Sequence, residues 1–393
     1  MKATHLRVAI LASLVVIASG CGSVTYYYYT PASGCIPASA PEVAYALTGY
    51  SVSMYMVDSC YGNFYPTHPA TIAAGGSPPD SPAEQMVADP GGRFAYVANL
   101  ISNASDLATI SMYTIDSTTG VLTPTTPATV PTGFFPQGIA IDPAGKFIYT
   151  ANSDDNTVSM FTINQTTGVL SPTSPTTVPI GAGTSPGFVT VDPTGKFAYV
   201  SNQDNDTISM FTINSTTGVL TATSPTTVAT GLSPFGVAVS PNDKFAYVPN
   251  NGSGGAITNG VSQYTINSTT GVLTPNTPAA VAAGNAPTAV AVDPTSKYAY
   301  VVNRNDNTVS MYTINSTTGN LTLNTTTNNP TGTISTGTQP YRIGFDPSGL
   351  FLYVTNEQSP ASIFVVNSDG TLSHAGTTGP VTGALSIAIT AIK

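Results

Sequence analysis

The 393-residue chain has no tryptophan, only 3 histidines and 3 cysteines, and only 7% charged residues. No Cys-x-x-Cys pair and no histidine cluster occurs, so the sequence contains no zinc-site pattern and no metal is expected. Basic residues are scarcer than acidic ones, 10 against 19, for a formal net charge of −9. This balance repels phosphate backbones and argues against a nucleic-acid partner.

What the chain has instead is apolar content of 41%, interrupted at regular places by 36 glycines and 32 prolines. This content is too high and too patterned for a disordered chain, so a large core is expected. Thr, Ser and Asn take the places usually filled by Lys, Glu and Arg, which predicts a polar but weakly charged surface.

The N-terminus reads as an export signal. Lys2 and Arg7 precede an apolar run from Val8 to Ile17, which is too short to span a bilayer comfortably. Ala-Ser-Gly-Cys follows, ending at Cys21, and resembles the lipobox of bacterial lipoproteins. That resemblance implies a signal over residues 1–20 and a lipidated Cys21, with an ordinary cleaved signal as the alternative.

The lipobox resemblance places the protein in the bacterial cell envelope, outside the cytoplasm and bound to a membrane by lipid. Gly22, rather than aspartate, follows Cys21, which favours the outer membrane or periplasm over the inner membrane. Residues 21–41 show no clear period and are interpreted as a tether. Cys35 and Cys60 are expected to form a structural disulfide, because two cysteines usually pair in an oxidising compartment.

Six copies of one phrase follow, spaced by 53, 50, 48, 53 and 53 residues. They are ADPGGRFAYVAN from Ala88, IDPAGKFIYTAN from Ile141, VDPTGKFAYVSN from Val191, VSPNDKFAYVPN from Val239, VDPTSKYAYVVN from Val292 and FDPSGLFLYVTN from Phe345. A period near fifty is typical of propellers or long solenoids. Each period contains four short strand signals separated by turns rich in Gly, Pro, Asn and Asp.

The third turn of the repeat reads Asn-x-Thr-Thr-Gly, with Asp replacing Asn in the first copy. Its glycine indicates a positive φ that side chains resist. The Asn-x-Thr triplets also match glycosylation sites, but turn chemistry explains them more simply.

The strand segments are apolar or small on both faces, so neighbouring sheets must cover them. Blades stacked around an axis satisfy this need. The first repeat, from Val43 to Val57, lacks a first strand, and a segment from Leu385 to Thr390 supplies one at the other terminus. We therefore predict an all-β, seven-bladed propeller of four-stranded antiparallel blades over residues 42–393, closed by an innermost C-terminal strand and monomeric.

These phrases resemble the YVTN-type repeats and, more broadly, the seven-bladed lactonase-like superfamily that includes 6-phosphogluconolactonases and muconate-lactonising enzymes. The resemblance covers residues 42–393. It implies the propeller fold and a site at the channel mouth, where first strands of such enzymes often begin with Pro-His. Here the corresponding places carry Glu84, Gln137, Gly187, Phe235, Thr288 and Tyr341, and none is histidine.

The mouth is formed by the loops that enter first strands and those that join second to third strands. Its candidate ligand-binding residues are Glu84, Gln85, Gln137, Asp204, Arg304, Tyr341, Arg342 and Glu357. Arg304 and Arg342 could bridge a ligand carboxylate, or an arginine could pair with Glu357 for structural reasons. The lysines of the repeats fall in turns on the opposite rim. Few basic side chains therefore remain at the mouth to bind the phosphate of a phosphorylated sugar lactone.

Acid–base residues are scarce at this mouth, so the first expectation is a binding or scaffold propeller that presents its loop face to a protein or glycan. The alternative is a lactonase-type hydrolase of an unphosphorylated lactone. No cofactor is expected. Polar loops such as Gln203 to Thr207 have oxygen ligands in alternation, but they fit solvated Asx turns better than calcium loops.

Overall fold

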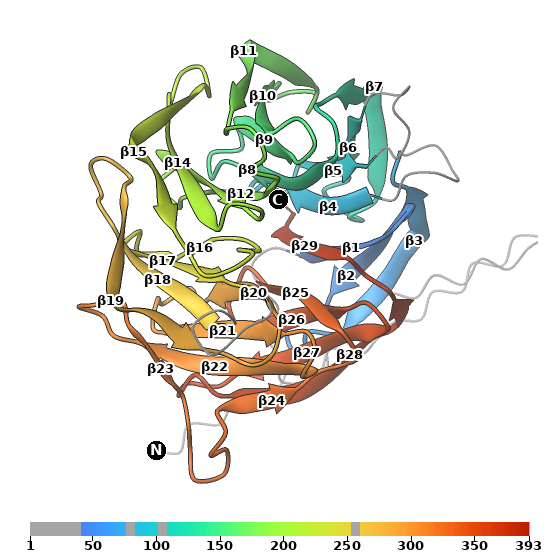
Figure 1. Ribbon diagram of the computed structural model, residues 1–393. Coiled ribbons are helices and arrows are strands. Elements are labelled where there is room, and N and C mark those ends of the chain that lie inside the picture. Colours follow the sequence, from blue (N-terminus) through green and yellow to red (C-terminus); the bar gives the residue numbers. More distant parts are fainter. Residues whose placement is uncertain (1–40, 76–82, 101–107, 253–259, 393) are drawn as a thin grey trace, which may run out of the picture.

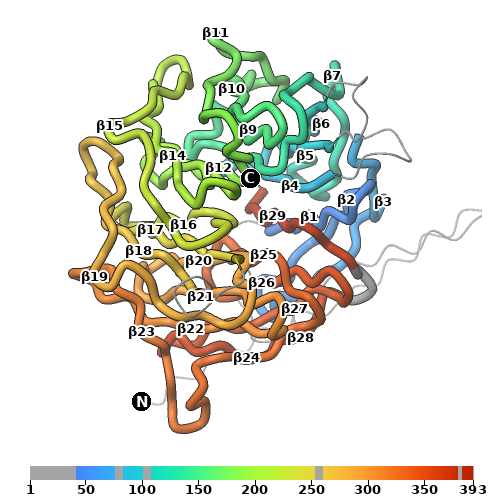
Figure 2. Tube along the Cα trace, in the orientation of Figure 1, coloured from blue at the N-terminus to red at the C-terminus, as the bar shows by residue number. Residues whose placement is uncertain are grey.

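The computed structural model describes residues 41–75, 83–100, 108–252 and 260–392. Their strands form seven separate antiparallel sheets arranged around a central axis as the blades of a propeller (Figures 1 and 2). The described residues contain no helix, and thus none that could cross a bilayer. The prediction of a seven-bladed β-propeller is confirmed.

Each blade is a meander of four strands, counted outward from the axis. The innermost strands are β4 (Ala83–Ala88), β8 (Pro136–Ile141), β12 (Pro186–Val191), β16 (Ala238–Val239), β20 (Pro287–Val292), β25 (Pro340–Phe345) and β29 (Ser386–Ala391). The second strands are β5 (Phe94–Asn99), β9 (Phe147–Asn152), β13 (Phe197–Asn202), β17 (Phe245–Pro249), β21 (Tyr298–Asn303), β26 (Phe351–Asn356) and β1 (Glu42–Thr48). Blades 1 to 7 are numbered in this order.

The two outer strands carry the rest of each repeat. The third strands are β6 (Thr109–Ile115), β10 (Thr157–Ile163), β14 (Thr207–Ile213), β18 (Gly260–Ile266), β22 (Thr308–Ile314), β27 (Ser359–Val366) and β2 (Ser51–Val57). The outermost are β7 (Leu122–Pro131), β11 (Leu170–Pro179), β15 (Leu220–Ala229), β19 (Leu273–Ala282), β23 (Leu321–Leu323), β28 (Leu372–Thr382) and β3 (Phe64–Ala73). In blade 5 a short strand, β24 (Thr333–Ser335), also pairs with β22.

The Asp-Pro turns are held by their own aspartates. In blade 2, Asp142 Oδ1 accepts the backbone N–H groups of Lys146 and Phe147, at 2.5 and 2.6 Å. These bonds satisfy donors that a tight turn leaves without a strand partner. The phrase that repeats in the sequence is therefore the turn and second strand of every complete blade.

Adjacent blades are joined by one hydrogen bond that recurs around the whole ring. A buried tyrosine of each second strand donates its hydroxyl to the carbonyl oxygen of the third-turn glycine in the next blade, at 2.8–3.1 Å. The pairs are Tyr45–Gly120, Tyr96–Gly168, Tyr149–Gly218, Tyr199–Gly271, Tyr247–Gly319, Tyr300–Gly370 and Tyr353–Gly62. The last pair joins blade 6 to blade 7 and closes the ring.

The hydrophobic core lies between blades. One cluster joins Tyr149 and Met160 of blade 2 to Val200 and Phe211 of blade 3. The turn glycine must be small here: Gly218 has a φ of +74°, and a Cβ on it would lie 2.3 Å from the ring of Phe147. The glycine therefore serves both the turn and the close approach of the neighbouring blade.

The two ends of the described chain share blade 7, in which β29 pairs with β1 from Glu42↔Ala391 to Leu47↔Ser386. Figure 1 shows this red strand innermost, with blue β1, β2 and β3 outside it. Further backbone bonds extend the join, from Leu385 N to Leu47 O and from Ile392 N to Pro41 O. The predicted closure by an innermost C-terminal strand is confirmed.

Deleting residues 384–393 should lower the melting temperature by more than about 10 °C or prevent folding, because β1 would lose its inner partner and the ring its last strand. Circular dichroism melts would measure this, with deletion of Lys393 alone as control. Equal melting temperatures for the two deletions would show that closure contributes little.

The closing sheet buries a carboxyl group, that of Glu42. This residue is only 3% exposed, and its Oε2 has no hydrogen-bond partner among the described residues. Burial, aided by the nearby charge of Asp346, raises the pKa of Glu42 to about 7. Because this folded-state pKa lies above the ordinary value of 4.5, the group's contribution to stability is complete below about pH 4.5 and is lost as pH rises through 7.

Glu42→Gln keeps the shape and removes the charge, so it should raise the melting temperature at about pH 8.5, with a difference that shrinks toward pH 4.5. Thermal melts of both proteins across this range measure the effect, and Asp204→Asn, at an exposed loop position, is the control. A Glu42→Gln gain independent of pH would contradict the assignment.

Candidate functional site

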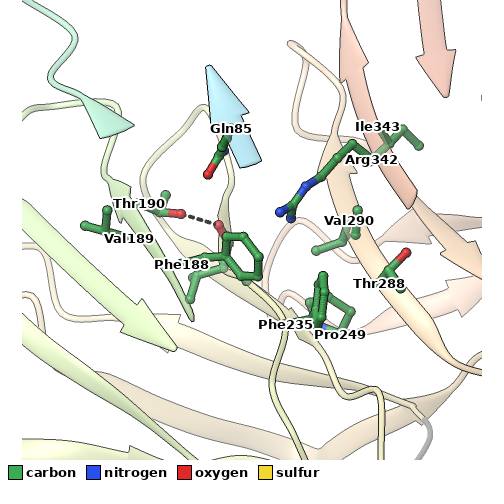
Figure 3. A pocket seen from close by; sticks show the side chains of 13 residues that line it. Gln85, Phe188, Val189, Thr190, Phe235, Pro249, Thr288, Val290, Arg342 and Ile343 are labelled. Carbon is green, nitrogen blue, oxygen red and sulfur yellow. Dashed lines mark hydrogen bonds between the residues drawn. The ribbon is translucent and has the colours of Figure 1, made fainter. Parts of the chain in front are cut away.

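A cavity of about 170 Å³ opens where the innermost strands begin. Its walls include Gln85 of β4, Phe188 and Thr190 of β12, Thr288 of β20, Arg342 of β25, and Phe235 just before β16. Figure 3 shows these side chains converging from separate blades, with the guanidinium of Arg342 pointing into the space. We call it the mouth cavity. Of the predicted mouth residues, Gln85 and Arg342 line it, whereas Glu84, Tyr341, Arg304 and Glu357 do not.

The innermost strands place these side chains at the cavity because their pairing is irregular near their first residues. The ladder of β12 shifts register between Pro186 and Val189, and comparable shifts occur in β4, β8, β20 and β25. A bulge of this kind turns consecutive side chains toward one side of a strand. Adjacent residues, such as Tyr341 and Arg342, can therefore both serve the mouth.

Arg342 lies among aromatic rings. Its Cζ is 4.0 Å from the ring centroid of Phe188, 4.8 Å from that of Tyr341 and 5.5 Å from that of Phe235. Its Nε and Nη2 atoms are buried without a hydrogen-bond partner. Burial lowers the pKa of Arg342, while Tyr341 and Glu84 oppose the shift, and the guanidinium stays charged because its ordinary pKa is so high.

Glu84 is the carboxyl group next to this cation. Tyr341 donates its hydroxyl to Glu84 Oε1 at 3.1 Å. Burial raises the pKa of Glu84, and the charge of Glu357 adds to the rise, whereas Arg342 and the tyrosine bond oppose it. The carboxyl and the guanidinium therefore interact electrostatically, and the site brings an acid–base group and a cation together.

Arg304 and Glu357 form an ion pair at the rim. Arg304 Nη2 lies 2.6 Å from Glu357 Oε2, with side chains 33% and 21% exposed. The pair links the β21–β22 loop to the β26–β27 loop and so joins blades 5 and 6. Of the two interpretations left open for Arg304, the geometry favours the structural pairing with Glu357.

The neutral polar side chains of the cavity already form hydrogen bonds within the protein, and these bonds decide which donors and acceptors remain for a ligand. Gln85 Oε1 accepts the N–H of Ile139 at 3.1 Å, which leaves its amide NH₂ as a donor. Thr190 and Thr288 donate their hydroxyl hydrogens to the carbonyl oxygens of Val237 and Tyr341, at 2.8 and 2.9 Å. Their oxygens remain available as acceptors for a ligand.

Other polar residues named from the sequence lie away from the cavity. Gln137 of β8 is half-buried and Asp204 is exposed on the β13–β14 loop, and neither lines the cavity. His68 and His374 lie on the outermost strands β3 and β28. Within the described segments, no group of three or more His, Cys, Asp or Glu side chains is arranged to hold a metal ion.

Phe188 was missed at the sequence level, although the repeat marks its position. It stands four residues before the aspartate of the Asp-Pro turn, the place held by Gln85 in blade 1 and Arg342 in blade 6. Blades 2, 4 and 5 have Gly138, Gly236 and Ala289 there. A large or polar residue at this position was the available signal.

Two predicted features fall partly outside the described residues. Cys60 is disulfide-bonded, whereas its predicted partner Cys35 lies outside the described part of the chain. The signal, the lipidation site Cys21 and the tether up to residue 40 lie outside it as well.

Comparison with known proteins points in one direction. A family model described as "Lactonase, 7-bladed beta-propeller" matches residues 42–182, 176–232, 224–333 and 277–389. Comparison with curated protein sequences finds no match.

Solved structures with the same fold include two proteins with 21% sequence identity, crystallised as candidate 6-phosphogluconolactonases. The one from Bacteroides uniformis has a TM-score of 0.69, covering 90% of this chain and 100% of its own. The one from Bacteroides fragilis has a TM-score of 0.68, covering 92% and 99%. The periplasmic gluconolactonase PpgL of Pseudomonas aeruginosa is 17% identical, with a TM-score of 0.69 and coverage of 90% and 100%. At these identities the likeness shows the fold alone.

Proposed function

The chain belongs to the family of lactonases with a seven-bladed β-propeller, and we propose that it hydrolyses a small unphosphorylated lactone at the channel mouth. One observation carries the proposal: Arg342 lines the mouth cavity, and Tyr341, whose ring centroid lies 4.8 Å from the Arg342 Cζ atom, donates its hydroxyl to the carboxyl group of Glu84. Family membership thus favours the hydrolase over the binding or scaffold module that the sparse acid–base residues suggested.

Lactone hydrolysis needs a cation that stabilises the developing negative charge and a base that activates water. Arg342 and Glu84 can act in these two roles. As water adds to the acyl carbon, negative charge grows on the carbonyl oxygen, and the Arg342 guanidinium would stabilise that charge. Glu84, as carboxylate, would take a proton from the attacking water and return it to the ring oxygen as the acyl C–O bond breaks, which gives a hydroxy acid. Burial, which raises the pKa of Glu84, makes it a stronger base near neutral pH.

The scarcity of positive charge in the cavity favours a substrate without a phosphate group. Among the described residues that line it, Arg342 is the only cation. Lys146, Lys196, Lys244 and Lys297 lie in turns at the opposite ends of the innermost strands. A phosphate group would gain little beyond this single charge, because phosphate recognition usually requires several Arg or Lys side chains.

Glu84→Gln and Arg342→Gln should each lower kcat/KM for a neutral aldonolactone by about 100-fold or more, since one removes the base and the other the cation. A pH-stat assay with D-glucono-δ-lactone measures this. The wild-type rate should fall as pH drops through the pKa of Glu84, which lies above 4.5.

Asp204→Asn and Lys146→Gln are matched controls, because both residues are exposed and neither lines the cavity. They should retain wild-type turnover. No turnover of any neutral lactone by folded wild-type protein, or equal losses in the control variants, would overturn the proposal.

We also propose that the protein works in the bacterial cell envelope, outside the cytoplasm, in the outer membrane or periplasm and attached by lipid at Cys21. The lipobox-like sequence supports this placement. A disulfide at Cys60 is consistent with an oxidising compartment. The apolar run from Val8 to Ile17 is too short to span a bilayer comfortably, so the anchor would be the acyl chains rather than a spanning segment.

Expression in a bacterial host with labelled palmitate should give a labelled, membrane-bound protein. Cys21→Ala should lose the label and appear in the soluble periplasmic fraction, because the modified sulfur is gone. The Cys60→Ala variant is the control and should keep the label. Label on Cys21→Ala would disprove the assigned site.

A further inference from the structure

We infer that the mouth cavity binds the carboxylate of a small polyhydroxy acid, held by Arg342. This inference deepens the proposed function and takes its choice of ligand from it, because ring opening of a neutral lactone creates a carboxylate in the same cavity. It adds a consequence that hydrolysis alone does not require: the acid product should bind more tightly than a neutral molecule of the same shape.

The first support is that the Arg342 guanidinium lacks a hydrogen-bonded anion. Its Nε and Nη2 are buried and have no hydrogen-bond partner among the described residues. Glu84 Oε1 accepts its hydrogen bond from the Tyr341 hydroxyl, and Glu357 pairs with Arg304. A buried cation without a hydrogen-bonded anion is destabilising, and an anionic ligand would offset that cost.

The second support is the way aromatic rings surround this cation. The ring of Phe188 packs 5.0 Å from that of Phe235, which in turn lies 5.6 Å from Tyr341 in an edge arrangement. The centroids of all three rings lie within 5.5 Å of the Arg342 Cζ atom, so part of the guanidinium faces aromatic surface instead of water. A planar carboxylate matches the in-plane N–H donors of a guanidinium, and partial desolvation strengthens that pairing.

The remaining polar groups fit a hydroxylated chain. Gln85 offers amide N–H donors, while the oxygens of Thr190 and Thr288 offer acceptors whose own hydrogens are already committed. Hydroxyl groups can satisfy both kinds of partner because each is donor and acceptor. The cavity of about 170 Å³ limits the ligand to a small molecule of monosaccharide size.

Isothermal titration of the purified protein with sodium gluconate, sorbitol and inorganic phosphate, at constant ionic strength, tests the inference. Sorbitol has the same carbon chain as gluconate, with one CH₂OH group in place of the carboxylate. Gluconate should bind at least about tenfold more tightly than sorbitol or phosphate and inhibit lactone hydrolysis competitively. Equal binding of gluconate and sorbitol, equal binding of phosphate, or no binding of gluconate would each overturn the inference.

Arg342→Gln should lose at least about tenfold in gluconate affinity, and Arg342→Lys should lose part of it, because a lysine keeps the charge without the planar fork. Lys146→Gln should bind as wild type. If Arg342→Gln does not fold, the wild-type comparison of the three ligands still decides. Gluconate binding without lactone turnover would refute only the hydrolase, and turnover without gluconate binding only the carboxylate site.

Discussion

The tyrosine–glycine hydrogen bond between neighbouring blades is the contact on which the architecture depends. It links the second strand of one blade to the outer turn of the next, and it is made seven times without a gap. The same glycine admits the aromatic ring or side chain at the start of the preceding blade's second strand. The sequence repeats because each blade forms the same interface with the next one around the ring.

This ring explains how a poorly charged chain builds a charged site. The blades hold the first strands in place. Side chains from blades 1, 3, 5 and 6, whose first strands shift register near their starts, meet Phe235 of blade 4 at one cavity. Arg342 and Glu84 are distant in sequence, and only closure brings them together. Placing a partly desolvated guanidinium among three rings costs folding free energy. The packing between blades offsets that cost.

The number of blades, their strand order and the shared closing sheet could be predicted from the sequence, because each depends on a repeat that survives with little variation. Gln85 and Arg342, which line the cavity, could be named because polar side chains stand out in an apolar strand. Phe188 holds the same place in its repeat but was not named, because an apolar side chain in an apolar strand looks like part of the core. The Arg304–Glu357 bond depends on the conformation of two loops, so sequence could only offer it as one of two pairings.

The sheet made by both ends of the chain has a consequence for biosynthesis. Its outer three strands are translated first and its inner strand last, so a nascent chain emerging from the ribosome has no complete circle to form. The cavity needs residues of blade 1 and blade 6 side by side, so it is complete only once the blades have assembled around the axis. Until β29 is available, β1 has no inner partner and the circle stays open at blade 7.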